Sequence, residues 1–181
     1  MRDTLDTPTP DEMPPVTPLG AAEGPAPTPH GAGQLAQFLP YQLSVASNAV
    51  SDLIAERYRE RFGLRVLEWR VMAILGDTNA GAGDEGLTQR ALTEAILTDK
   101  VAINRACKVL EGRGLIARVP NASDGRSHLM ILTDEGRKIH SEVLPIALET
   151  ERQLLAGFSA PEQAQLRAML ERLRHRIVDL A

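Results

Sequence analysis

Positive charge is concentrated in one part of this 181-residue chain, although the chain as a whole has a formal net charge of -4. Residues 87–128 contain seven Lys or Arg residues against four Asp or Glu residues. Residues 1–35 contain five acids against one base, which accounts for the negative balance. A local cluster of basic side chains can bind phosphate groups, so residues 87–128 are a candidate nucleic-acid site; an ordinary solvated surface is the alternative.

The stretch NASDGRSHLMILT, residues 121–133, carries three separate signals. Its first three residues form a glycosylation sequon, which has meaning only in a secreted protein. Asp124-Gly125 is a turn signal typical of β-hairpins. Arg126 follows the turn as a cation whose only acidic neighbour in sequence is Asp124, which we expect to hold it in place.

Cys107 is the only cysteine, which excludes an internal disulfide and favours a reducing cytoplasm. The chain has no run of about 18 apolar residues, so we expect no membrane contact through a spanning helix. Its first residues lack a basic segment followed by an apolar one, so no secretory signal is predicted. The predicted location is cytoplasmic, where the sequon meets no glycosylation machinery.

Helical patterns must position these residues. From Leu39 to Ile54 apolar residues recur at spacings of three and four, which predicts a helix that Gly63 ends. A second helix is predicted over residues 66–75, and the glycines of residues 76–86 predict a loop.

Two shorter helices are predicted next. Thr88 can cap the third, and either Thr98 or Asp99 can cap the fourth, which covers residues 100–111. The glycines of residues 112–114 end the fourth helix. This pair has the helix-turn-helix arrangement.

A hairpin is predicted after the helix pair, because strand-like runs flank the Asp-Gly signal at residues 115–119 and 128–133. Thr133 can then cap a long helix running from Asp134 towards Phe158. The last helix opens at residues 159–162 with the spacing of a capping box. Leucines and an isoleucine follow in it at spacings of four and three, a coiled-coil type seam that can pack on a partner subunit or on the chain's own core.

The predicted fold is mostly α with a small β-hairpin wing (α+β): a winged helix-turn-helix with terminal dimerisation helices. Residues 1–35 are predicted to be a disordered, Pro-rich acidic arm, since they hold eight of the twelve prolines. Residues 36–62 and 134–181 are predicted to form the helical dimerisation region, and residues 63–133 are predicted to form the winged helix-turn-helix, the expected DNA-binding lobe. The residues expected at the dimer interface are Leu39, Leu43, Leu166, Leu170, Leu173 and Ile177.

Residues 87–139, LTQRALTEAILTDKVAINRACKVLEGRGLIARVPNASDGRSHLMILTDEGRKI, resemble the winged helix of MarR-type transcriptional regulators. DKVAINRACKVLEGRGLIAR is similar to the family's recognition helix and the strand after it. DGR matches its wing tip, and LTDEGR matches the start of its fifth helix. Gly125 departs from the pattern, because the family often has a second basic residue there.

The resemblance implies a homodimer that binds pseudo-palindromic double-stranded DNA, most often as a repressor, and that a small molecule releases. The residues expected to contact DNA are Thr88, Gln89, Lys100, Val101, Ala102, Asn104, Arg105, Lys108, Asp124, Arg126 and Ser127. Asn and Arg can bind adenine and guanine through two hydrogen bonds each, and Lys108 is expected to contact phosphate. Val101 and Ala102 can touch thymine methyl groups or can be helix filler.

The effector pocket is harder to place from sequence. The resemblance implies an aromatic or phenolic carboxylate held between the dimer helices and the DNA-binding lobe. The residues that could line the pocket are Tyr41, Ser44, Asn48, Trp69 and Arg70. Alternatively, Trp69 belongs to the core and Arg70 to a surface salt bridge.

Other chemistry is not predicted. The four histidines are scattered and no metal-ligand spacing occurs, so neither a metal, a cofactor nor an enzyme is expected. Cys107 lies on the apolar stripe of its helix, where a buried thiol is inert, and the family's usual sensing cysteine lies in the first helix, where this chain has none. A thiol-based oxidant sensor and a winged-helix protein-interaction module without DNA binding are the alternative functions.

Overall fold

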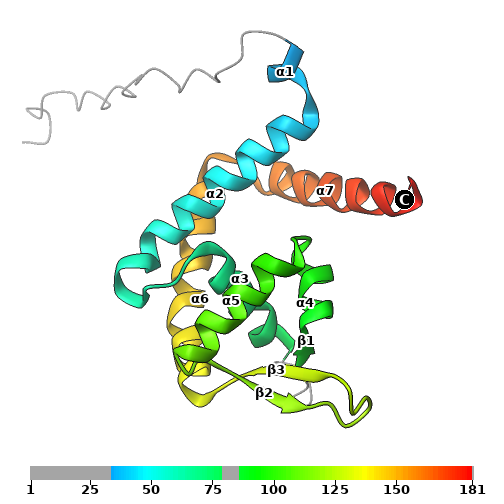
Figure 1. Ribbon diagram of the computed structural model, residues 1–181. Coiled ribbons are helices and arrows are strands. Elements are labelled where there is room, and N and C mark those ends of the chain that lie inside the picture. The colour runs from blue at the N-terminus through cyan, green and yellow to red at the C-terminus, as the bar shows by residue number, and fades with distance from the viewer. Residues whose placement is uncertain (1–33, 79–85, 181) are drawn as a thin grey trace, which may run out of the picture. The chain divides into compact units, whose positions relative to one another are not determined.

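The computed structural model describes residues 34–78 and 86–180 (Figure 1). The chain divides into two compact units, residues 1–42 and residues 43–181. In the first unit, helix α1 (Gln34–Gln37) is followed by the start of α2 (Leu39–Phe62). Most of the predicted acidic arm, and residues 79–85 of the predicted glycine-rich loop, lie outside the described residues.

The second unit contains the rest of α2 and then the predicted helices and hairpin strands in the predicted order, together with β1 and a 3-10 turn that were not predicted. The elements after α2 are α3 (Val66–Thr78), β1 (Leu87–Thr88), α4 (Gln89–Ile96), α5 (Lys100–Gly112), β2 (Ile116–Pro120), β3 (His128–Leu132), α6 (Asp134–Leu154), a 3-10 turn (Leu155–Gly157) and α7 (Ala160–Leu180). The fold is therefore mostly helical with one small sheet, as predicted.

The sheet has three antiparallel strands in the order β1-β3-β2. Arg118 of β2 lies opposite Met130 of β3, and Leu87 of β1 lies opposite the same methionine on the other side. Figure 1 shows the β2–β3 hairpin at the edge of the unit, with its loop projecting beyond the helices. β1 was not predicted, because two residues are too few to show a strand pattern.

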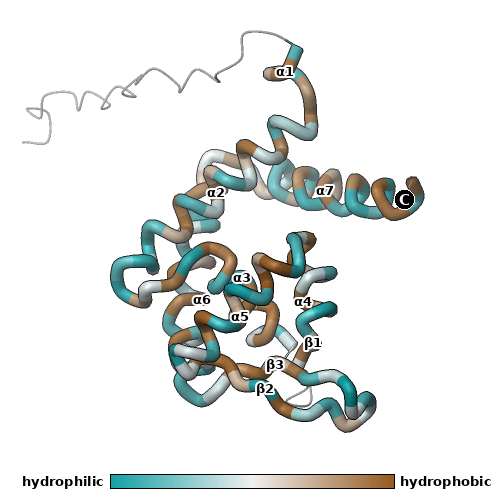
Figure 2. The backbone as a smooth tube through the Cα atoms, in the orientation of Figure 1, coloured by the Kyte–Doolittle hydropathy of each residue, from teal (hydrophilic) through white to brown (hydrophobic). Residues whose placement is uncertain are grey.

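The core lies between α3, α4, α5, α6 and the inner face of the sheet. Met72, Leu92, Ile103, Met130 and Val143, each 1% exposed or less, come from these five parts of the chain. Figure 2 shows apolar and polar residues alternating along α7, which has no buried residue. The core therefore fixes the winged-helix part of the unit, while α7 contributes an exposed surface.

Side-chain caps set where the helices begin, as the sequence predicted. Thr88, Asp99 and Thr133 each accept a hydrogen bond from the backbone N–H three residues later, at 2.9 to 3.1 Å. α2 ends at Phe62 because Gly63 adopts a positive φ of 60°. The capping box of α7 is half formed, since the Glu162 carboxylate accepts both the N–H and the hydroxyl of Ser159 at 2.7 Å.

Candidate DNA-binding surface

A tight turn, residues 97–99, connects α4 to α5. Leu97 ends α4 with a left-handed φ of 53°, and Asp99 then caps α5 by accepting the Ala102 N–H at 2.9 Å. The left-handed conformation is unusual for a leucine, and this side chain is 84% exposed. The turn orients α5 with its first residues at the surface.

α5 has a buried face and an exposed face, as its sequence pattern predicted. The buried side chains are Ile103, Ala106, Cys107 and Leu110. The exposed ones include Lys100, Val101, Arg105 and Lys108, whereas Ala102 and Asn104 are half-buried. The helix thus offers solvent a strip that is basic at three positions and apolar at Val101, which is 58% exposed.

Gln89 and Asn104, both predicted to contact DNA, lie together in the structure. The Gln89 amide nitrogen donates to the Asn104 side-chain oxygen at 3.4 Å. Burial raises the pKa of the Cys107 thiol, and this effect exceeds the lowering by the neighbouring Gln89 amide. The complete burial of Cys107 and its raised pKa match a structural role, since a reactive cysteine needs a depressed pKa and an accessible sulfur.

Three of the seven cations in residues 87–128 already have partners. Arg90 pairs with Glu94 at 2.8 Å, and Arg118 pairs with Glu111 through two bonds of 2.6 and 3.1 Å. The Arg113 guanidinium donates to two carbonyls at the end of α2. Within residues 34–78 and 86–180, four cations of this segment have no hydrogen-bond or ion-pair partner for their side chains: Lys100, Arg105, Lys108 and Arg126.

A seven-residue loop, residues 121–127, closes the wing. The last strand pair is Pro120 opposite His128. Beyond it, the Asn121 N–H donates to the Ser127 carbonyl at 3.2 Å, and the Asn121 amide donates to the Ser127 hydroxyl at 2.8 Å. The asparagine of the sequon therefore builds the wing loop, and Ser127, a predicted DNA contact, is used in the same way.

The predicted hairpin is present, and Asp124-Gly125 lies in its loop, but the loop is wider than the two-residue turn that Asp-Gly most often forms. Such a turn requires positive φ at both residues, and the described glycines with positive φ are Gly63 and Gly114. Asp124 also does not hold the Arg126 guanidinium, since its carboxylate accepts the Arg126 backbone N–H at 3.1 Å. Asp124 shapes the loop, and the arginine side chain is left exposed at the tip.

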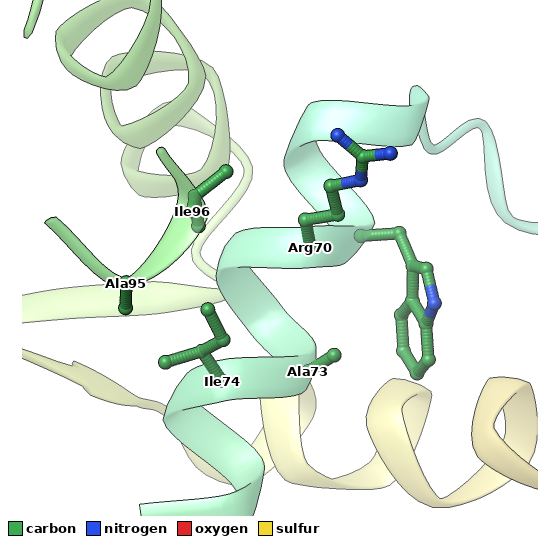
Figure 3. A pocket seen from close by; sticks show the side chains of 6 residues that line it. Arg70, Ala73, Ile74, Ala95 and Ile96 are labelled. Carbon is green, nitrogen blue, oxygen red and sulfur yellow. The ribbon is translucent and has the colours of Figure 1, made fainter. Parts of the chain in front are cut away.

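A pocket of about 290 Å³ lies between α3 and the end of α4 (Figure 3). Its lining consists of Trp69, Arg70, Ala73, Ile74, Ala95 and Ile96. Figure 3 shows Ile74 of α3 projecting towards the part of α4 that carries Ala95. The structure thus brings two of the five predicted effector residues to one pocket and adds four apolar ones that the sequence did not single out.

Trp69 and Arg70 have further contacts that define their roles. Trp69 is 8% exposed and stacks on His140 at 5.5 Å between ring centroids, so it belongs to the core as well as to the pocket wall. Burial lowers the pKa of His140. Arg70 donates to the Ser51 hydroxyl at 2.8 Å, and no acid among residues 34–78 and 86–180 forms an ion pair with it.

The remaining predicted effector residues do not line this pocket. Ser44 and Asn48 are exposed on α2, and Tyr41 belongs to the first compact unit. Among the described residues, no group of three or more His, Cys, Asp or Glu could hold a metal ion. Within the same ranges, no helix is long and apolar enough to cross a membrane.

The predicted dimerisation residues lie on surfaces that the described part of the chain leaves uncovered. Leu166, Leu170 and Ile177 of α7 are 42%, 44% and 59% exposed. Leu173 is half-buried, as is Leu43 of α2, and Leu39 is 53% exposed in the first unit. An apolar seam of this kind exposed along one helix is typical of an interaction surface.

The helix pair α4–α5 with a β2–β3 hairpin behind it defines a winged helix-turn-helix. Residues 62–127 match the family model described as MarR family. The chain is 31% identical to a probable transcriptional regulator from Pseudomonas aeruginosa, with a TM-score of 0.66 over 77% of this chain and 99% of that one. The chain therefore belongs to the MarR family of winged-helix transcriptional regulators.

More distant structures share the fold. A putative MarR-family regulator from Listeria monocytogenes, complexed with 26mer DNA, is 20% identical with a TM-score of 0.67, covering 76% of this chain and 87% of that one. CouR from Rhodococcus jostii RHA1, bound to p-coumaroyl-CoA, is 22% identical with a TM-score of 0.64, covering 78% of this chain and 95% of that one.

Proposed function

We propose that this protein is a homodimeric, ligand-responsive repressor that binds a pseudo-palindromic DNA operator. The observation that carries the proposal is the exposed face of α5, where three basic side chains have no partner within the described residues. Cations without an ion-pair partner are available to phosphates, and charge neutralised by phosphate dominates protein–DNA affinity. The family to which the chain belongs, and the DNA complex of the Listeria protein, support this assignment.

In this proposal α5 enters the major groove. Arg105 and Asn104 contact base edges, because guanidinium and amide groups can form paired hydrogen bonds with guanine and adenine. The Gln89 amide donates to the Asn104 side-chain oxygen at 3.4 Å, so the two side chains can act together at the groove. Lys100 and Lys108 contact phosphates, which positions the helix without reading sequence. Val101 is available to a thymine methyl group.

The wing supplies the second contact. Arg126 stands on a loop that its own hydrogen bonds hold together, and it enters or flanks the minor groove beside the operator half-site. Narrow A·T-rich minor grooves concentrate negative potential and attract arginine. Gly125 next to it adds no charge, so each wing contributes one guanidinium.

Dimerisation places two such surfaces on one face of DNA. The exposed apolar residues of α7, together with those of α2, form the proposed interface with a second copy. In a symmetric dimer the two α5 helices lie in successive major grooves, about 10 base pairs apart. The operator would then be pseudo-palindromic.

The pocket beside α3 is the proposed effector site. Apolar side chains line most of it, and Arg70 provides a cation that has no acidic partner in the described part of the chain. A pocket with this lining suits an apolar or aromatic carboxylate of small size. CouR binds p-coumaroyl-CoA, the thioester of an aromatic acid, which supports the aromatic part of this assignment and not the carboxylate. Such a ligand would release DNA by favouring a dimer whose two α5 helices no longer match the half-site spacing.

Selection of DNA from a random pool, followed by anisotropy titrations, tests the proposal. We expect a pseudo-palindromic site bound by two protomers. Arg105→Ala should relax base preference at one position per half-site by about 1–3 kcal/mol, whereas the exposed control Arg59→Ala should not. Failure to enrich any sequence at low salt would instead indicate a winged helix used for protein–protein contact.

A further inference from the structure

The end of α5, the proposed recognition helix, is hydrogen-bonded to the end of α2, a helix of the proposed dimer interface. Arg113, the first residue after α5, donates through one guanidinium nitrogen to the Gly63 carbonyl at 2.9 Å. Its other terminal nitrogen donates to the Phe62 carbonyl at 2.6 Å. Within residues 34–78 and 86–180, no other hydrogen bond joins α5 to α2.

The contact is chemically well matched. The last carbonyls of a helix have no partner in the helix and carry partial negative charge. A planar guanidinium can satisfy two such carbonyls at once in a fixed geometry, which a lysine ammonium cannot reproduce. At Gly63 the chain leaves α2 with a positive φ of 60°, and both carbonyls are bound by the same side chain.

The backbone that carries Arg113 is held firmly to α5. The Arg113 N–H donates to the Val109 carbonyl at 3.1 Å, and the Leu115 N–H donates to the Leu110 carbonyl at 2.9 Å. Leu115 itself is 2% exposed, which anchors the turn in the core. A displacement of the end of α2 would therefore be transmitted through Arg113 to α5, because the backbone at Arg113 is hydrogen-bonded to α5.

The same end of α5 is also joined to the wing by an ion pair. Glu111, in the last turn of α5, binds Arg118 of β2 through two hydrogen bonds of 2.6 and 3.1 Å. Arg113 is thus linked to β2, the strand that leads to the wing tip. The link runs along the chain from Arg113 to Glu111 and then through the Glu111–Arg118 ion pair. The contact of Arg113 with the end of α2 therefore affects the position of both proposed DNA contacts, α5 and the wing.

The geometry points to Arg113 as a positioning residue that sets where α5 sits relative to α2, and so fixes the spacing of half-sites that the dimer accepts. This inference rests on the proposed function, since it presupposes two α5 helices reading one operator. Arg113 does not touch DNA in it. Arg113 acts by restricting the two recognition helices to one separation.

Operators with altered spacing test the inference. The selected site is rebuilt with its half-sites one or two base pairs closer together or further apart, and each duplex is titrated with full-length protein. Arg113→Met removes the donors at similar length, Arg113→Lys keeps the charge but not the fork, and Arg59→Met is an exposed control on α2. Wild type and Arg59→Met should discriminate sharply between spacings.

We expect Arg113→Met to lose at least about fivefold of that discrimination while its binding to random DNA stays unchanged, with Arg113→Lys in between. A uniform loss of affinity with the spacing ratios preserved would overturn the inference, because it would show a merely structural arginine. Absence of any specific binding by wild type would instead refute the proposed function.

A second measurement, made without DNA, distinguishes failure of the positioning role from failure of the proposed function. Spin labels on Lys108→Cys, in a Cys107→Ser background, report the distance between the two α5 helices of a dimer. Arg113→Met should broaden this distance distribution, and Arg59→Met should not. An unchanged distribution in Arg113→Met would contradict the positioning role whatever the DNA result.

Discussion

Gly136 lies where the first turn of α6 presses on the turn after α5, and adding one methyl group there should cost much of the stability. A Cβ at this position would lie 1.9 Å from the Leu115 carbonyl oxygen, which is backbone and cannot rotate away. The two segments are also joined by hydrogen bonds, since Thr133 donates to Leu115 at 3.1 Å and to Gly114 at 2.6 Å. Relief of the clash must therefore stretch these bonds.

The expected cost of Gly136→Ala has two parts. Overpacking in a rigid environment costs about 1–3 kcal/mol. Loss of two hydrogen bonds adds about 1 kcal/mol each. The sum, about 3–5 kcal/mol, is a large part of the roughly 5–15 kcal/mol that stabilises an ordinary domain.

Urea unfolding followed by circular dichroism measures this cost, with Gly112→Ala as the matched control. Gly112 is the last residue of α5, and a Cβ there would have nothing within 4 Å. Alanine is a better helix former than glycine, so Gly112→Ala should be neutral or stabilising by up to about 1 kcal/mol. A loss below about 1 kcal/mol for Gly136→Ala, or equal effects of the two substitutions, would refute the reasoning.

Three further predictions concern the wing, the cysteine and the histidine. A Cβ at Gly125 would have nothing within 4 Å, so Gly125→Lys should leave the melting temperature unchanged. The added charge should raise DNA affinity and steepen the dependence of that affinity on salt. A lower melting temperature would contradict the open geometry. Cys107 is fully buried and its pKa is raised, so a thiol reagent at pH 8 should modify it only on unfolding; rapid labelling of the native protein would be the contrary result. Burial lowers the pKa of His140, so the unfolded chain binds its proton first as the pH falls, and the free energy of unfolding should decrease between about pH 7 and 5. His140→Gln should flatten that part of the stability profile, and an unchanged slope would argue against the effect.

Local signals made most of the fold predictable. Thr88, Asp99 and Thr133 each bind a backbone N–H only three residues away, so their capping roles follow from sequence spacing. The buried stripe of α5 follows in the same way from helical periodicity. β1 was missed because it consists of two residues whose partner strand is distant in the chain.

Contacts between distant residues account for what the sequence could not show. Arg113 binds the Phe62 carbonyl, which lies 51 residues earlier in the chain. The sequence alone could not show that this arginine already has a partner, because the contact depends on the tertiary fold. The hairpin was predicted but the width of its loop was not, because Asn121 and Ser127 pair across the loop and hold Asp124-Gly125 within a wider turn. Ala95 and Ile96 become pocket residues only because α4 packs beside α3.

The salt dependence of operator binding tests the proposed DNA-binding surface most directly. Wild type, Arg126→Ala and the control Arg59→Ala are titrated on the selected operator across a series of salt concentrations. Each phosphate contact contributes about 0.9 to the slope of log affinity against log salt, so loss of two wing arginines from a dimer should reduce the slope by about 2 and weaken binding to all sequences. Arg59→Ala should match wild type. An Arg126→Ala protein with the wild-type affinity and slope would contradict the assignment of the wing to DNA.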